Sequence, residues 1–130
     1  MKRLFAAAVI IIVILALSIA GYYLNNDLID TTNELLSQSV SLSNREDKQG
    51  LIDAAEKACE YWESKAVPVL SSLIMHSEID KISYHFKTLL LLAKDGNFEE
   101  YRVVCFECIA TLEHIKDVQN PVLKNVLHII

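Results

Sequence analysis

The sequence predicts an all-α protein in which a single N-terminal transmembrane helix is followed by an antiparallel bundle of three or four helices. Three observations support this prediction. Residues 4–24 carry no charge. Apolar residues in the rest of the chain recur in steps of three and four, which is the period of an amphipathic helix. No segment shows the period of two that a half-buried strand requires, and only three glycines are present to form turns.

The uncharged segment from Leu4 to Leu24 has the length of a membrane span. At ~1.5 Å per residue it reaches ~31 Å as a helix, which matches the hydrocarbon core of a bilayer. Lys2 and Arg3 precede it, so the positive-inside rule places residues 1–3 in the cytoplasm. Tyr22 suits the opposite interface. The predicted partner of residues 4–24 is therefore the lipid bilayer, with the bulk of the chain outside the cell membrane.

A cleaved signal peptide is the alternative interpretation of this segment. Ser18 and Ala20 supply the small residues that precede a signal-peptidase site, with cleavage after Ala20. The apolar run is longer than the usual ~7–15 residues and continues past that site, which favours an uncleaved anchor. Both interpretations place the remaining chain outside the cytoplasm.

The composition is uneven along the chain. Apolar residues make up 52% of the whole, but they are concentrated in the first 24 positions. Without Lys2 and Arg3, the 12 bases fall to 10 against 17 acids. This acidic exterior lacks the basic face that nucleic acids and anionic lipid surfaces require, so no nucleic-acid partner is expected.

Residues 25–44 are predicted to form a stalk and hinge. Leu28 and Leu35 continue the helical spacing of the anchor, but four serines then alternate with other residues between Ser37 and Asn44. We expect a loop or a frayed helix end there, with Asn44 as the cap of the next helix.

Residues 45–130 are predicted to form the extracytoplasmic helical bundle. Its first helix carries the apolar stripe Leu51, Ala55, Ala58, Trp62, Ala66, Val69 and Leu73, and Pro68 must kink or restart it. The second carries Ile79, Ile82, Phe86, Leu89 and Ala93, and Gly96 suits the left-handed residue that closes it.

A third helix is predicted after Asn97, which forms a capping box with Glu100. Its stripe comprises Tyr101, Cys105, Cys108, Leu112 and Ile115, and we expect it to end near Gln119. Asn120-Pro121 then predicts the start of a short closing helix, since proline is favoured at the first helical position.

The Cys105-Phe106-Glu107-Cys108 motif has the C-x-x-C form of redox sites, but it falls mid-helix on the core stripe. We therefore expect buried, free thiols at Cys59, Cys105 and Cys108, although their redox state is left open. A zinc site would need a second ligand pair, which the sequence lacks. The sequence predicts neither a metal nor a cofactor.

His76 and Asp80 lie one helical turn apart in the densest polar cluster. A structural bond between histidine and carboxylate, an exposed face, and a metal or proton-transfer site are three possible interpretations. Trp62 is predicted to be a core anchor with a hydrogen-bonded N–H, in preference to a ligand platform. His85, His114 and His128 stand at no diagnostic spacing.

Several motifs follow one another along the chain: Trp62-Glu63-Ser64-Lys65, then His76-Ser77-Glu78-Ile79-Asp80, then a capped helix and a closing Pro-Val-Leu-Lys-Asn-Val-Leu. This order resembles that of the family called domain of unknown function 4363. Its members are small, singly anchored helical proteins of Gram-positive bacteria. The resemblance covers residues 1–130 and implies a cell-membrane protein without an assigned activity. It singles out, without roles, the motif positions Trp62, Lys65, His76, Glu78, Asp80 and Asn125. Pro68 and the C-x-x-C pair are not features of that family.

The expected function is that of a non-enzymatic interaction or structural module of the cell envelope, which binds another envelope protein or a second copy of itself. A ligand-binding sensory bundle is the alternative, with Trp62 and the His76–Asp80 region lining a small cavity. The sequence shows no nucleophile–base pair, so no catalytic residue is assigned.

Overall fold

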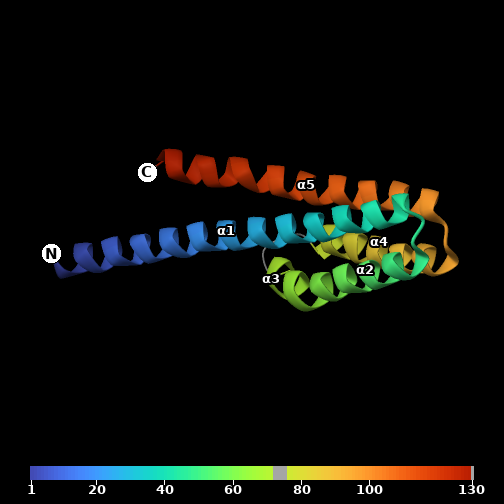
Figure 1. Cartoon of the computed structure of the whole chain (residues 1–130). Helices are drawn as coiled ribbons and strands as arrows, with labels where there is room; N and C mark the ends of the chain where they lie inside the picture. Colours follow the sequence, from blue (N-terminus) through green and yellow to red (C-terminus); the bar gives the residue numbers. More distant parts are fainter. Residues whose placement is uncertain (72–75, 130) are drawn as a thin grey trace.

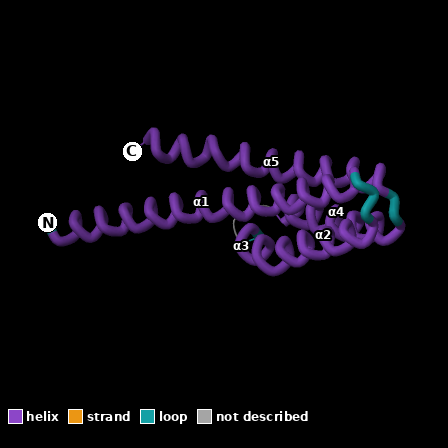
Figure 2. The backbone as a smooth tube through the Cα atoms, viewed as in Figure 1, coloured by secondary structure: helices purple, strands orange, loops and turns teal. Residues whose placement is uncertain are grey.

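The structure is a computed structural model of the 130-residue chain. It describes the backbone of residues 1–71 and 76–129, and side chains of that range as far as Asp117. Every regular element in these residues is helical, which confirms the all-α class. Figures 1 and 2 show long helices lying alongside one another. They are α1 (Lys2–Asn44), α2 (Lys48–Tyr61), α4 (His76–Asp95) and α5 (Phe98–Ile129), with a π-helical turn η1 (Trp62–Ala66) and the short α3 (Val67–Leu70) after α2.

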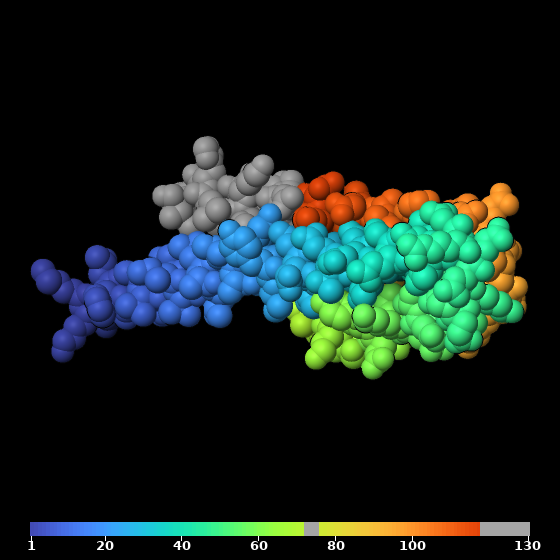
Figure 3. Space-filling view, in the orientation of Figure 1, coloured from blue at the N-terminus to red at the C-terminus, as the bar shows by residue number. Residues whose placement is uncertain are grey.

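Helix α1 has two parts of different character. Its apolar N-terminal part has no buried residue over the most apolar 18 positions, and it projects beyond the other helices (Figures 1 and 3). Within the described residues, α1 is the only helix long and apolar enough to cross a membrane. From Asn25 onward it buries one face against the other helices, with buried residues Asn25, Leu28, Ile29, Thr32, Leu36, Ser39 and Ser43.

The loop or hinge predicted between Ser37 and Asn44 is wrong, because α1 continues without a break to Asn44. Ser39 donates to the carbonyl of Leu36 at 2.6 Å, and Ser43 donates to that of Val40 at 2.7 Å. Both serines are fully buried. Their hydroxyls are satisfied within their own helix, so small polar residues can occupy its packed face.

Helix α2 begins after Asp47, so the predicted cap at Asn44 is also wrong. The Asp47 carboxylate accepts a hydrogen bond from the Gly50 N–H at 3.0 Å, as an N-cap side chain does. Asn44 is instead the last residue of α1, and only residues 45–47 connect the two helices.

The predicted irregularity at Pro68 is present, and it takes the form of the π-helical turn η1. The Val67 N–H bonds to the Trp62 carbonyl, five residues back. This extra residue in the turn shifts the buried face: Leu70 is buried after Ala66, whereas the predicted Val69 is only half-buried. Leu73 lies outside the described residues.

The predicted core faces of the next two helices are confirmed. On α4, the buried residues are Ile79, Ile82, Phe86, Leu89 and Ala93, and on α5 the five predicted residues are buried together with Val104. Gly96 has φ +72°, the left-handed conformation expected of it. Asn97 accepts from the Glu100 N–H at 3.3 Å, as a cap.

The helix end predicted near Gln119 and the separate closing helix are wrong, because α5 continues to Ile129. Pro121 has no N–H to bond the carbonyl of Asp117, so the helix passes it with one backbone bond fewer.

The core lies between α1, α2, α4 and α5. Helix α1 contacts α2 and α5, and α4 contacts the same two helices. The seam between α1 and α5 also carries polar contacts along its rim. Asn33 donates to Glu113 at 2.8 Å, and Lys116 pairs with Asp30 at 2.8 Å.

Candidate functional site

A shallow groove of about 350 Å³ lies beside the π-helical turn and includes the predicted motif position Lys65. Helix α1 contributes Thr31 and Leu35 to it. The remaining lining residues come from α2 and η1: Lys57, Glu60, Tyr61, Ser64 and Lys65.

The π-helical turn explains why this groove carries polar groups. The wider turn places Ser64 and Lys65 on the exposed side while Trp62 and Ala66 remain buried. Ser64 donates to the Glu60 carbonyl at 2.6 Å, so its hydroxyl is held against the helix. Among the described residues neither Lys57 nor Lys65 forms an ion pair, so their ammonium groups can pair with an anionic group.

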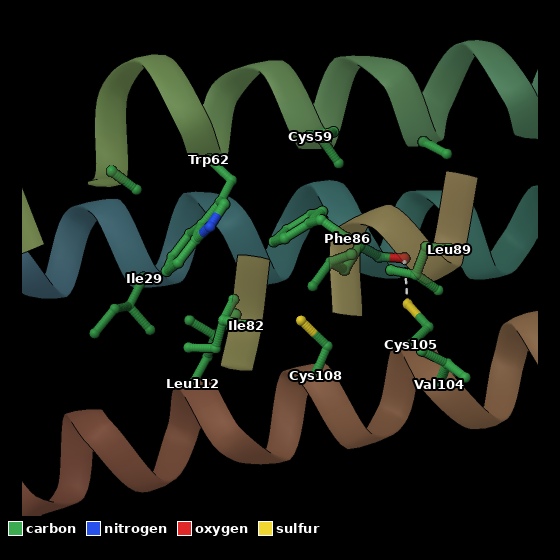
Figure 4. Packing of buried hydrophobic residues seen from close by; sticks show 14 of the residues in the cluster. Ile29, Cys59, Trp62, Ile82, Phe86, Leu89, Val104, Cys105, Cys108 and Leu112 are labelled. Atoms are coloured by element: carbon green, nitrogen blue, oxygen red, sulfur yellow. Dashed lines mark hydrogen bonds between the residues drawn. The ribbon is translucent and has the colours of Figure 1, made fainter. Parts of the chain in front are cut away.

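Trp62 does not line the groove but fills the core (Figure 4). Its ring is fully buried and stacks on Phe86, with centroids 5.6 Å apart and planes at 20°. Its indole N–H donates to the Ser83 hydroxyl at 2.9 Å. The prediction of a core anchor with a satisfied N–H is therefore confirmed.

The predicted motif positions are not brought together in one site. Lys65 is exposed at the groove, whereas Trp62 is buried in the core. His76 and Asp80 are exposed at the start of α4, and Glu78 between them is half-buried. Asn125 belongs to α5, but its side chain lies outside the described part of the structure.

The His76–Asp80 pair forms no structural bond. Among the described residues, no hydrogen bond or ion pair joins either side chain to another, and both are exposed. This geometry favours the exposed-face interpretation over the other two. The residues described include no group of three or more His, Cys, Asp or Glu side chains arranged to hold a metal ion.

The C-x-x-C cysteines lie in the core, as predicted, and are free (Figure 4). The Cys105 thiol donates to the Leu36 carbonyl at 3.5 Å and lies 3.9 Å from the Ser39 hydroxyl. Burial raises the pKa of Cys105 to about 11 and that of Cys108 to about 12. Both thiols are therefore protonated near neutral pH, the opposite of what a reactive cysteine requires.

Sequence reasoning missed most of the groove. The sequence places Thr31, Leu35, Lys57 and Tyr61 in helices but not in a site, because periodicity within one helix does not show which residues of another helix lie across from it. The signal that was available was Pro68, since a proline inside an apolar stripe must change the helical geometry before it.

The chain matches no family model, no curated protein and no solved structure.

Proposed function

We propose that this chain is a membrane-tethered helical module of the envelope of a Gram-positive bacterium, and that it binds a second envelope protein or another copy of itself without performing catalysis. In this proposal residues 1–3 are cytoplasmic, residues 4–24 span the cell membrane, and the remaining helices form an antiparallel four-helix bundle outside. The resemblance to the domain of unknown function 4363 family is part of the same proposal.

The observation that carries the proposal is the division of α1 into an exposed apolar part and a packed part within one helix. Exposed apolar surface of this size is costly in water, and a bilayer removes that cost. Examples are Ile10 at 58% and Leu17 at 68% exposure. Because no break separates this part from the packed part, the anchor carries the other helices directly.

Exposed apolar side chains on α4 and on α5 support a protein partner. Tyr84 and Leu91 are 69% and 65% exposed and lie seven residues apart, on the same side of α4. Val103 and Phe106 are exposed on α5, which packs beside α4. Aromatic and large aliphatic side chains of this kind are typical anchors of protein interfaces.

The proposal is tested by crosslinking from outside the cell. Leu91→Cys is labelled in intact cells with a membrane-impermeant maleimide that carries a photoreactive group. We expect illumination to yield a product of discrete mass, because Leu91 lies in the proposed interface. A mass of twice the chain identifies a second copy. The native thiols are buried and give little background.

Asp53→Cys, at an exposed position on α2, is the matched control. It should be labelled equally well from outside but should give no discrete product. Equal products from both positions would show random collisions, and labelling of neither position before lysis would contradict the location of the module.

A ligand-binding sensory bundle is the second candidate, and the groove beside η1 is the observation that favours it. An amphiphilic anion would place its charge near Lys57 and Lys65 and its apolar part over Leu35. A ligand of this kind should raise the melting temperature of the protein, and Lys65→Ala should reduce that shift. Glu56→Ala, at an exposed α2 position outside the groove lining, should leave the shift unchanged.

A further inference from the structure

We infer that the short helix α3 is a second membrane contact, which rests on the outer leaflet beside the exit of α1 from the bilayer, with Lys65 placed at the lipid phosphates. This inference rests on the proposed membrane span of α1. It goes beyond that span, because an anchor alone does not specify whether the outer helices touch the membrane surface. The partner is a phospholipid interface, in which headgroups and the upper acyl carbons meet α3.

The register between α1 and α2 sets the level of α3 above the membrane. Only residues 45–47 connect the two helices, so α2 starts beside the far end of α1. Further along, Thr31 and Leu35 of α1 line the same groove as the residues between Lys57 and Lys65. The middle of the α1 pair is therefore level with about position 61, and each later residue lies one helical rise closer to the membrane.

Continued at that register, α3 comes level with about residues 24–27 of α1, which is the end of the proposed span. Figure 1 also places α3 at the end of α2 that is nearer to the projecting apolar part of α1. A headgroup layer extends roughly 5–7 Å beyond the hydrocarbon core, or about four α1 residues. Helix α3 therefore lies within that layer, next to the acyl chains, and Lys65 lies at its outer edge.

The surface of α3 suits this layer. Pro68 is exposed, Val67 and Val69 are half-buried, and α3 has no charged residue. On α1, Leu24 at the same level is 48% exposed. Apolar side chains at this depth lose contact with water when they meet the upper acyl carbons, which stabilises the contact.

The charge beside α3 also suits a phospholipid. From Ser64 to Ser71 the only formal charge is that of Lys65, although the chain contains 17 acids. Lys65 is exposed and forms no ion pair among the described residues. At the edge of the headgroup layer its ammonium stays hydrated and can pair with a phosphate. A zwitterionic lipid supplies that phosphate, so the contact does not require the basic face that the acidic exterior lacks.

Spin labels on the full chain in palmitoyl-oleoyl phosphatidylcholine vesicles, at a high ratio of lipid to protein, test the inference. Single cysteines carry the label at Pro68, at Lys65, at Ile14 in the span and at Asp53, which is exposed on α2 and ~25 Å beyond the end of the span. The measurement is the accessibility to oxygen, which partitions into lipid, divided by the accessibility to the water-soluble nickel complex NiEDDA. We expect this ratio to fall in the order Ile14, Pro68, Lys65, Asp53, and to be several-fold higher at Pro68→Cys than at Asp53→Cys.

The role of Lys65 has its own test in the chain labelled at Pro68→Cys. Lys65→Glu should lower the ratio of oxygen to NiEDDA accessibility, because phosphate repels a carboxylate at that level. Lys57→Glu makes the same change of charge in the same groove but two helical turns further from the membrane, so it should leave the ratio unchanged. Equal ratios in these two variants would overturn the assignment of Lys65 to the phosphates.

The outcomes separate this inference from the anchor on which it rests. Ratios at Pro68→Cys and Lys65→Cys equal to that at Asp53→Cys, with Ile14→Cys protected from NiEDDA, overturn the contact of α3 alone. Exclusion of both reagents from these two positions shows burial in protein and overturns it as well. NiEDDA access at Ile14→Cys overturns the span and the α3 contact together. Lys65→Cys retains the proline, so it reports the level of this region even if Pro68→Cys alters the turn.

Discussion

At the scale of single residues, Trp62 shows how the core is held together by both shape and polarity. Its ring stacks on Phe86 and its N–H reaches Ser83, so one side chain contacts two positions on α4. A buried indole N–H without an acceptor would lose its hydrogen bonds to water and gain none in return. The Ser83 hydroxyl stabilises the folded state because it accepts this hydrogen bond.

Ser83→Ala should therefore lower the free energy of unfolding by about 1–3 kcal/mol, the cost of leaving a buried donor unsatisfied. Chemical denaturation of the full chain in detergent micelles measures this. In a Trp62→Phe background the same substitution should have almost no effect, because the donor is gone. Thr88→Ala, whose hydroxyl bonds only within α4, is the control. Equal losses in the two backgrounds would contradict the proposed role of this bond.

The two buried thiols predict a loss of stability at alkaline pH. Their pKa values are raised from 9.0 to about 11 at Cys105 and about 12 at Cys108. The folded state therefore holds these protons more tightly than the unfolded state does. The resulting stabilisation is complete below about pH 9 and is lost as the pH rises through 11 and 12.

At ~1.4 kcal/mol per pKa unit, the loss is on the order of 2–3 kcal/mol for Cys105 alone. We expect the free energy of unfolding to fall more steeply between pH 9 and 11 in the native chain than in Cys105→Ala/Cys108→Ala. Only the slopes of the free energy of unfolding against pH are compared, because the two alanines also change the packing of the core. Parallel slopes would show that other groups, such as buried Tyr101, cause the alkaline loss.

At the scale of elements, the π-helical turn η1 acts as a one-residue insertion in the helix that begins at Lys48. Trp62, Ala66 and Leu70 are all buried, so the core face continues across this turn. The turn also makes room for the ring of Pro68, which would clash with the preceding turn of an α-helix.

Deletion of Ser64 should convert this turn to a regular α-helical turn without changing which residues are buried after it. The deletion alone should be destabilising by up to ~3 kcal/mol, because Pro68 then meets an ordinary α-turn. Adding Pro68→Ala should restore most of that loss, as measured by thermal unfolding followed by circular dichroism.

Deletion of Lys57, an exposed residue within regular α2, is the matched control. It rotates the two halves of the buried stripe against each other by ~100°, so Pro68→Ala should not rescue it. Rescue of both deletions, or of neither, would be inconsistent with a one-residue insertion at η1.

The sequence predicted best those elements in which local signals and burial agree. The stripes of α4 and α5, the left-handed Gly96 and the Asn97 cap all follow from periodicity and turn chemistry alone. The errors fall where packing overrides a local preference. Ser39 and Ser43 read as loop residues because serine is polar, but a close neighbouring helix favours small side chains there.

The candidate site was less predictable than the fold. The motif resemblance singles out Lys65, but its groove is formed by residues of α1, α2 and η1 together. His76 and Asp80 have the spacing of a paired site, yet spacing within one helix does not specify what lies across from it. That information is held in the tertiary arrangement.

At the scale of the whole molecule, the topology can be measured at the far end of α1. Asn44 is exposed at the last turn of this helix, beyond the packed part. In the proposed topology, in which the positive-inside rule places Lys2 and Arg3 in the cytoplasm, Asn44→Cys should react with an impermeant maleimide in intact cells. Lys2→Cys removes one of these positive charges, so a lysine is inserted before position 2 to restore it. This variant should react only after lysis. The reverse pattern would place the bundle in the cytoplasm.

The continuity of α1 has a mechanical consequence for a chain anchored in this way. A helix without a hinge resists both bending and twisting. The exposed apolar side chains of α4 and α5 therefore point in a fixed direction relative to the membrane-spanning part of α1. One residue added at the membrane exit would turn the outer helices by ~100° and raise them by ~1.5 Å. Two such chains that cross the bilayer side by side would therefore hold their outer faces at a set angle, and a twist applied outside would reach the cytoplasmic end.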